Sequence, residues 1–223
     1  MAPWYNIGAM NREPFTTNEY YHIYNRGVDK RRVFMSQWDV DRFIKSMRFF
    51  NSLLPIGSLH EKEFITEPGA KPPRELVEIV AFCLNPNHFH MILKQISDNG
   101  IPEFMRRLSG GYTWHFNNRT ERNGSLFQGR YKSKYIHDND YLLRLSAYVN
   151  LNDRVHSLGG STAKWVRSSW NEYIKNEPDI CETSIVLDQF KNTKEYEAFA
   201  LEALPQILER KASDKELAKL LME

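Results

Sequence analysis

The fold is decided by residues 77–93, which read VEIVAFCLNPNHFHMIL. Two apolar runs of strand length flank the turn-forming triplet NPN, so this stretch predicts a β-hairpin. Residues two apart in a strand point to the same side of a sheet, which places His88 and His90 side by side. Two adjacent imidazoles can bind one divalent metal ion. A His-x-His pair also occurs by chance, with each ring at the surface or satisfied in a core.

The whole chain sets wider bounds. Its 223 residues suit one domain with an appendage or two small domains. The net charge of +2 is too small to indicate a polyanionic partner by itself. Cys83 and Cys181 have no paired spacing, which argues for a reducing compartment and against a disulfide scaffold or a zinc ribbon. We see no signal sequence and no apolar run long enough for a bilayer, so we expect a cytoplasmic protein without a membrane partner.

Local signals predict the remaining elements in order. Ser36 and Asp138 are expected to cap two of the helices, and Pro55 is expected to end the first helix. The expected elements are a loose leader (1–18), a strand (20–26), a helix (38–54), an exposed excursion (59–74), the hairpin, a helix (102–119), an extended ribbon (126–136), a helix (139–151), a Trp-rich loop (165–173) and helices over 184–191, 194–210 and 214–222.

This order of elements predicts an α+β fold, with an antiparallel sheet and helices packed on one face. The Gly159-Gly160 pair marks the end of the first unit. We therefore expect one domain over residues 1–158 and a helical C-terminal extension over residues 159–223.

Tyr148 and Asn152 stand four residues apart, so on one helix their side chains would project from the same face. A tyrosine hydroxyl is a weak nucleophile, because its pKa is about 10. It can attack a phosphodiester when a metal ion or a base lowers the cost of forming the phenolate. Asn152 can add a neutral oxygen ligand to a metal ion held by His88 and His90. A tyrosine among leucines is also a common core residue, so spacing alone leaves both roles open.

Basic and aromatic side chains alternate between residues 105 and 135. Basic groups bind phosphates and aromatic faces stack on unpaired bases, a combination that suits single-stranded nucleic acid. A solvated helix face over core aromatics would give the same composition, so both interpretations remain open. The candidate DNA-binding residues are Arg106, Arg107, Arg119, Arg130, Lys132 and Lys134.

Four blocks of sequence resemble the REP-associated tyrosine transposases, within the HUH superfamily of single-stranded-DNA transposases. The blocks are YHIYNRG (21–27), NPNHFH (85–90), GSLFQGRYKS (124–133) and YLL with YVNLN (141–143 and 148–152). Residues 165–173 are also similar to a downstream segment of that family. Order and spacing agree from Tyr20 to Leu158, and four blocks in order are a specific signal.

The resemblance implies that His88 and His90 bind Mg²⁺ or Mn²⁺, that Asn152 completes the metal site, and that Tyr148 is the nucleophile. It implies a ferredoxin-like antiparallel sheet backed by helices. The implied reaction links DNA to the protein as a 5′-phosphotyrosine near hairpin elements, frees a 3′-hydroxyl, and rejoins the strand by the reverse step. The implied partner is single-stranded or hairpin DNA, bound by a monomer or a homodimer.

Two residues depart from the family pattern. Asn85 stands where Met is usual, and Asp153 stands where Pro is common, which adds a negative charge near the nucleophile. Tyr112 is a rival nucleophile, but Phe116 occupies the position where an Asn or Gln would follow it, so Tyr148 is favoured.

Three functional hypotheses follow. The leading one is a transposase-like, metal-dependent transesterase that cuts and rejoins single-stranded DNA. The second is a domesticated protein that binds hairpin DNA or RNA without cutting it. The third is a His-based metallohydrolase that uses water and forms no covalent adduct with DNA.

Overall fold

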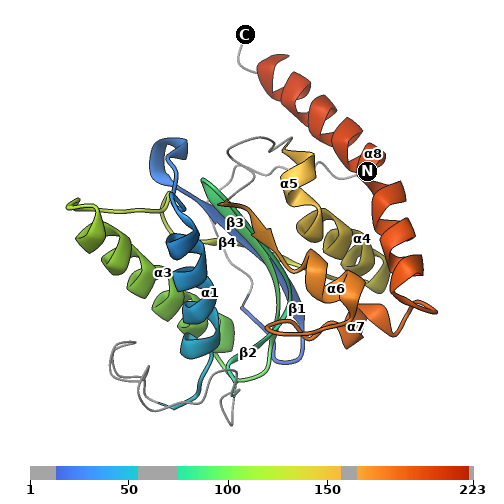
Figure 1. The fold of residues 1–223 in the computed structure, drawn as a ribbon, viewed down its shortest axis with the longest axis horizontal. Coiled ribbons are helices and arrows are strands. Elements are labelled where there is room, and N and C mark those ends of the chain that lie inside the picture. Colours follow the sequence, from blue (N-terminus) through green and yellow to red (C-terminus); the bar gives the residue numbers. More distant parts are fainter. Residues whose placement is uncertain (1–13, 55–74, 157–164, 221–223) are drawn as a thin grey trace.

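The computed structural model describes residues 14–54, 75–156 and 165–220. A five-stranded sheet lies between two layers of helices (Figure 1). The strand order is β4-β1-β3-β2-β5, and every neighbouring pair is antiparallel. The predicted α+β fold with a ferredoxin-like antiparallel sheet is therefore confirmed. The strands are β1 (Tyr20–Arg26), β2 (Val77–Asn85), β3 (His88–Gln95), β4 (Lys132–Tyr135) and β5 (Arg167–Ser168).

The predicted hairpin forms the centre of this sheet. β2 and β3 pair from Val77 with Gln95 to Asn85 with His88, around the turn at Pro86. A register shift between Ile79 and Ala81 turns two successive residues of β2 toward the same face. Both strands are buried almost throughout, as expected for strands covered on both faces.

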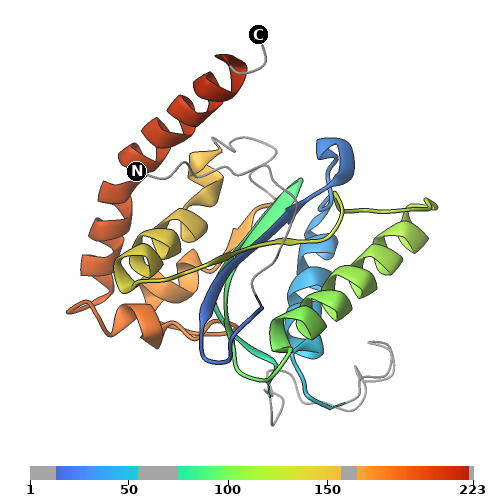
Figure 2. The same ribbon diagram turned by 180° about the vertical axis from the view of Figure 1, so that it is seen from behind.

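One face of the sheet is covered by α1 (Gln37–Phe50) and α3 (Gly100–Arg119), which lie side by side in both views (Figures 1 and 2). The Ser36 hydroxyl accepts a hydrogen bond from the Asp39 amide, which confirms the predicted cap. The helix ends at Phe50, earlier than predicted, because the Asn51 side chain binds the backbone of residues 76 and 77 instead. The core on this face includes Ile23, Phe43, Phe82, Phe89 and Leu108.

The other face is covered by α4 (Asn139–Asn150), α5 (Asn152–Val155), α6 (Trp170–Lys175), α7 (Ser184–Leu187) and α8 (Thr193–Leu220). Its separate core includes Ala81, Cys83, Leu145, Tyr173 and Tyr196. The prediction of helices on one face is corrected by this arrangement. The cause is that β2 carries buried side chains on both of its sides, and each set needs a covering layer.

Several predicted boundaries also change. The predicted ribbon contributes only β4 as a strand, and the predicted Trp-rich loop contains β5 and α6. The two last predicted helices are one helix, α8, and a short 3₁₀ helix, Val28–Lys30, follows β1. The domain boundary predicted after residue 158, the excursion over 59–74, the predicted stop at Pro55 and most of the leader fall outside the described residues.

Within the part of the chain that the structure describes, we find no helix both long and apolar enough to span a bilayer.

Candidate active site

His88 and His90 lie on β3 and face the helical layer of α4, as the alternation of strand residues predicts. Phe89, between them, belongs to the core under α1 and α3. The two imidazole centroids are 5.3 Å apart. On the neighbouring strand, Tyr24 is the register partner of His90, and their rings stack with centroids 5.7 Å apart. The two histidines therefore form one site between the sheet and α4.

Each histidine has a polar partner at its Nδ1 atom. His88 Nδ1 donates a hydrogen bond to the Asn87 Oδ1 atom over 2.6 Å, because an amide oxygen can only accept. His90 Nδ1 lies 2.9 Å from the Nε2 atom of His22 on β1. Partners at Nδ1 are the usual way in which proteins orient histidines that bind metals through Nε2.

Burial keeps the imidazoles of His22 and His90 neutral. Desolvation, and then the positive charge of Lys134, lower the pKa of His22 to about 3. Desolvation, followed by the neighbouring histidines, holds the pKa of His90 well below its ordinary value. A neutral imidazole keeps the lone pair that a metal ion needs.

Asn152 lies against the first of the two histidines. Its Oδ1 atom is 3.3 Å from His88 Nε2, and both atoms are acceptors. The side chain of Asn85 fills the space beside them, with its Nδ2 atom 2.9 Å from His88 Nε2 and 2.7 Å from Asn152 Oδ1. The lone pairs of His88 Nε2 and Asn152 Oδ1 converge on the Asn85 Nδ2 donor. A cation could take the place of that donor, so the residues present fit a divalent ion.

Tyr148 brings a hydroxyl-bearing ring to the same place. It is half-buried on α4, and its ring stands edge-on to His90 and His22, with centroids 5.5 and 6.3 Å apart. The Asp138 carboxylate accepts a hydrogen bond from the Tyr141 amide and confirms the predicted cap of α4. The prediction that one helix carries Tyr148 and Asn152 is wrong, because α4 ends at Asn150 and Asn152 opens α5. The two residues nevertheless meet at the histidines.

One known protein family matches the part of the chain that carries this site. Residues 73–152 match a family described as "Transposase IS200 like", and the matched range includes both histidines, Tyr148 and Asn152. This segment is therefore similar to the IS200-like transposases. A solved structure described as the REP-associated tyrosine transposase bound to a REP hairpin is similar, at 14% identity and a TM-score of 0.47. The match covers 78% of this chain and 90% of that chain. No curated protein matches significantly.

Tyr112, the rival nucleophile, lies in the core on the opposite face of the sheet. Its hydroxyl donates a hydrogen bond to the Val33 carbonyl over 2.6 Å. Burial raises the pKa of Tyr112, which makes its phenolate less accessible. The sheet separates it from His88 and His90, so it cannot reach the site of its own chain.

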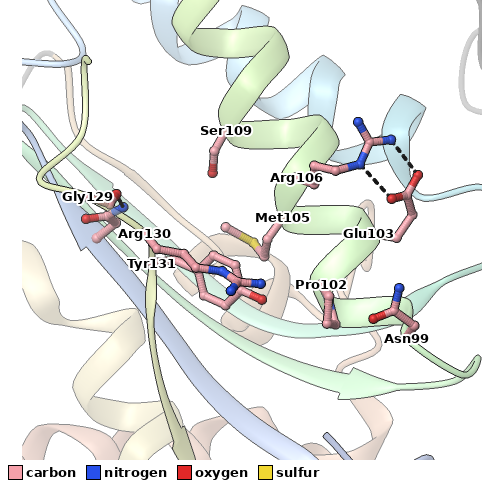
Figure 3. Close-up of a pocket in the computed structure, with 10 residues that line it drawn as sticks. Asn99, Pro102, Glu103, Met105, Arg106, Ser109, Gly129, Arg130 and Tyr131 are labelled. Carbon is pink, nitrogen blue, oxygen red and sulfur yellow. Dashed lines mark hydrogen bonds and ion pairs between the residues drawn. The ribbon is translucent and has the colours of Figure 1, made fainter. Parts of the chain in front are cut away.

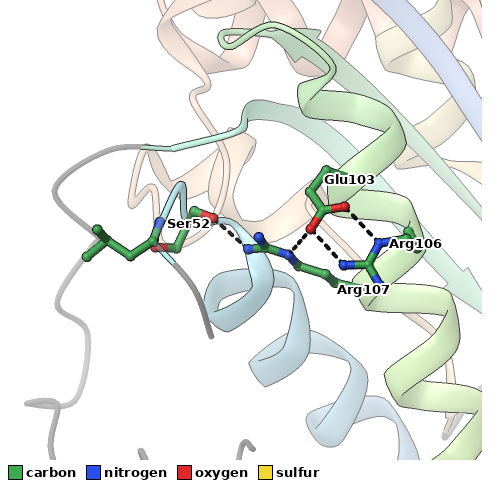
Figure 4. Close-up of polar contacts among 5 residues, drawn as sticks. Ser52, Glu103, Arg106 and Arg107 are labelled. Atoms are coloured by element: carbon green, nitrogen blue, oxygen red, sulfur yellow. Dashed lines mark hydrogen bonds and ion pairs between the residues drawn. The ribbon is translucent and has the colours of Figure 1, made fainter. Parts of the chain in front are cut away.

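Two of the predicted DNA-binding residues are tied to other parts of the fold. Arg107 binds Glu103 and the carbonyl oxygen of Ser52, each over 2.6 Å (Figure 4). Arg119 binds both oxygens of the fully buried Asp39 carboxylate, over 2.7 and 2.9 Å. These guanidinium groups hold α1, α3 and the following loop together.

Arg106 and Arg130 line a cleft of about 510 Å³ on the α3 side of the sheet (Figure 3). Arg106 is exposed but forms a two-pronged ion pair with Glu103, and hydrogen bonds from Arg106, the largest effect, lower the pKa of that carboxyl to about 2. Arg130 is exposed and its guanidinium lies 5.9 Å from the centre of the Tyr131 ring.

Lys132 and Lys134 lie on β4 and share the sheet face of the two histidines. Their register partners on β1 are Tyr24 and His22. The Lys134 ammonium lies 5.1 Å from the centre of the Tyr141 ring, which places a cation beside the helix that carries Tyr148. The structure therefore divides the six predicted basic residues between the two faces of the sheet.

Sequence reasoning missed four polar neighbours of the site. Asn87 and Asn85 flank the turn, and their proximity to His88 was a usable signal. His22 depends on the pairing of β1 with β3, which no local pattern gives. His156, with its ring centroid 4.6 Å from that of His88, sits where α5 ends. Among the described residues, no group of three or more His, Cys, Asp or Glu side chains is arranged to hold a metal ion. The candidate set of metal ligands therefore needs the Asn152 amide oxygen in addition to His88 and His90.

Proposed function

We propose that this protein is an IS200-like transposase that cleaves and rejoins single-stranded DNA beside hairpin elements, with Tyr148 as the nucleophile. One observation carries the proposal. The half-buried Tyr148 ring stands 5.5 Å from the His90 ring, on the sheet face that also holds His88 and Asn152. A core tyrosine would have no need of two imidazoles and a buried amide as neighbours.

His88 Nε2, His90 Nε2 and Asn152 Oδ1 are the atoms that would hold a divalent ion. Such an ion supplies positive charge that offsets the developing charge on a phosphodiester. His22 and Asn87 orient the two imidazoles through their Nδ1 atoms. A mixed set of imidazole and oxygen ligands suits Mn²⁺ and accommodates Mg²⁺.

The proposed chemistry is a phosphoryl transfer between two oxygen atoms. The Tyr148 oxygen attacks the scissile phosphorus in line, and a new phosphorus–oxygen bond forms to the DNA 5′ side. The bond to the 3′-oxygen breaks, and that oxygen takes up the equivalent of the phenolic proton to leave as a hydroxyl. The 5′-phosphotyrosine retains the energy of the bond, so the reverse attack of a 3′-hydroxyl reseals the strand without a nucleotide cofactor.

Basic residues near the site would bind the phosphates of the DNA strand. Lys132 and Lys134 extend from the sheet edge on the Tyr148 side, and exposed Arg130 follows the same edge toward the cleft. Contacts of this kind bind phosphates without reading sequence. We propose that Lys132, Lys134 and Arg130 position the DNA, whereas Arg107 and Arg119 stabilise the fold.

A denaturing gel tests the proposal. End-labelled single-stranded hairpin DNA from the sequence flanking this gene is incubated with Mn²⁺ and wild-type protein, Tyr148→Phe or Tyr112→Phe. We expect a protein-linked DNA band that Tyr148→Phe abolishes and Tyr112→Phe retains. EDTA, His88→Ala and His90→Ala should each remove the band while a gel shift of the hairpin persists.

Other outcomes separate the alternatives. A tight gel shift without any adduct would favour a binding protein that does not cut. Cleavage without an adduct, unaffected by Tyr148→Phe, would favour a hydrolase that uses water. Loss of the band only in Tyr112→Phe would overturn the assignment of the nucleophile.

A further inference from the structure

The Asn85 amide occupies the position where ligand lone pairs converge. Its Nδ2 group donates one hydrogen to His88 Nε2 and the other to Asn152 Oδ1, over 2.9 and 2.7 Å. The His88 tautomer is consistent with this, because its Nδ1 hydrogen is already donated to Asn87. Asn85 is fully buried, so water does not compete for these contacts. A neutral amide therefore satisfies two of the three atoms that the proposed metal site would use.

The surroundings of Asn85 fix which end of the amide faces the site. Its Oδ1 atom accepts a hydrogen bond from the Cys83 thiol, over 3.6 Å. Turning the amide around would bring its oxygen against the Asn152 oxygen, and two acceptors at hydrogen-bond distance repel each other. The donor end is therefore the end held against His88 and Asn152.

Asn152 shows the cost of this arrangement. Its own Nδ2 atom is buried and has no hydrogen-bond partner among the described residues. A buried amide without a partner is unfavourable, so the side chain is held in place by what its oxygen contacts. In the described part of the chain that contact is the Asn85 donor.

We propose that Asn85 is a built-in competitor of the metal ion, whose amide must withdraw from His88 and Asn152 before a divalent ion can bind there. This inference rests on the proposed metal site. A lone pair cannot serve a donor hydrogen and a cation at once, so binding the ion breaks two buried hydrogen bonds. Asn85 thereby lowers the affinity of the site for the ion and keeps its ligands ordered when the ion is absent.

The test measures Mn²⁺ binding without DNA. Isothermal titration, with electron paramagnetic resonance of free Mn²⁺ as a second readout, compares wild-type protein, Asn85→Leu and Asn87→Ala. Leucine resembles asparagine in shape but donates no hydrogen bond, so we expect Kd to fall about 10- to 100-fold, of the order of two buried hydrogen bonds that no longer have to be broken. Asn87→Ala removes the acceptor that orients His88, so its Kd should rise. The two substitutions are thus matched neighbours of one histidine with opposite expected effects.

The outcomes are decisive. A Kd for Asn85→Leu that is unchanged or raised overturns the proposal. Asn85→Ala gives the same test if the leucine variant does not fold. Loss of binding in His88→Ala shows that the measured ion is at this site, so the proposed metal site and the role of Asn85 fail separately. If neither wild type nor either Asn85 variant binds Mn²⁺, both ideas are wrong.

Discussion

At the scale of single residues, the site depends on which nitrogen of each imidazole carries hydrogen. Asn87 settles this for His88, because an amide oxygen accepts only from an N–H group. For His90 the partner is another histidine, His22, which can either donate or accept. A metal-binding His90 needs His22 to accept, so His22 acts as a positioning residue in the proposed site.

His22→Phe is therefore expected to weaken Mn²⁺ binding by about 10- to 100-fold, the usual effect of losing a partner of a ligating histidine. The phenyl ring keeps the packing against Tyr24 but cannot hold the hydrogen bond to His90. Titration of Mn²⁺ into the protein without DNA measures the effect. His115→Phe, on α3 at the other face of the sheet, is the control and should leave Kd unchanged. Equal affinities for His22→Phe and wild type would contradict the positioning role.

At the scale of elements, α1 and α3 are joined by an ion pair that composition suggested was a DNA contact. Asp39 is fully buried near the start of α1 and also accepts a hydrogen bond from the Met35 amide. Arg119, at the end of α3, neutralises it. Removing the arginine would leave a buried carboxylate without its cation.

Arg119→Ala should lower the free energy of unfolding by about 2–3 kcal/mol, less than for a fully buried pair because Arg119 is partly exposed. Arg130→Ala should change it by less than about 0.5 kcal/mol, since Arg130 is exposed. Affinity for hairpin DNA should show the opposite pattern, because Arg130→Ala should lower it more than Arg119→Ala. Urea unfolding and a gel shift on both variants give the comparison. A larger loss of DNA affinity in folded Arg119→Ala would restore that residue to the DNA surface.

The contact between α4 and α8 has a titratable hydroxyl at its centre. Tyr196 on α8 is buried, accepts a hydrogen bond from Asn150 Nδ2 over 2.8 Å and lies 3.1 Å from Ser146 Oγ. Burial, the largest effect, raises its pKa to about 12. The folded chain therefore keeps this proton between pH 10 and 12, whereas the unfolded chain releases it, so its contribution to stability is present below pH 10 and lost as pH rises.

Tyr196→Phe should be about 1 kcal/mol less stable than wild type at pH 9, because hydrogen bonds are lost. That difference should shrink as pH rises above 10, with a slope of up to about 1.4 kcal/mol per pH unit. Urea unfolding at pH 9, 10.5 and 11.5 measures it, and the other buried tyrosines contribute equally to both proteins. A difference that stays constant with pH would contradict the role of the Tyr196 proton.

Local signals predicted most elements because their causes are local. The hairpin follows from two apolar runs around Pro86, and the caps at Ser36 and Asp138 need only the next turn of helix. The end of α1 was misplaced because the Asn51 side chain binds the backbone 25 and 26 residues further on, where β2 begins. The continuity of α8 was missed although residues 211–213, Lys-Ala-Ser, contain neither glycine nor proline.

Some features of the site likewise follow from local sequence, and others depend on distant contacts. His88 and His90 share a face because a strand repeats every two residues, and sequence alone predicts that. The contact between His22 and His90 depends on the register of β1 against β3, and the burial of Tyr112 depends on which face α3 covers. Both are set by packing between distant segments. The partition of the basic residues between two faces has the same origin.

At the scale of the whole molecule, the sheet places Tyr148 beside the histidines of its own chain. The described C-terminal elements complete this face, since β5 pairs with β2 and α8 packs on α4 (Figure 1). One chain therefore holds every group that the proposed reaction needs. We propose that the site works within a single chain, whether or not the protein forms dimers.

Mixing Tyr148→Phe with His90→Ala protein should accordingly give no DNA adduct, because neither chain has a complete site. When either variant is mixed with wild type, the amount of adduct should be proportional to the amount of wild-type protein. The denaturing gel described above provides the readout. An adduct that reappears only when the two variants are mixed would show that Tyr148 acts on the histidines of a partner.

The central claim is that Tyr148 becomes covalently linked to DNA. The most direct measurement is mass spectrometry of peptides from the adduct, after nuclease digestion has trimmed the DNA to a short 5′-phosphorylated remnant. The account predicts that the added mass lies on the peptide that contains Tyr148 and that fragmentation places it on that residue. A remnant on any other residue, or a cleaved strand with no modified peptide, would contradict the account.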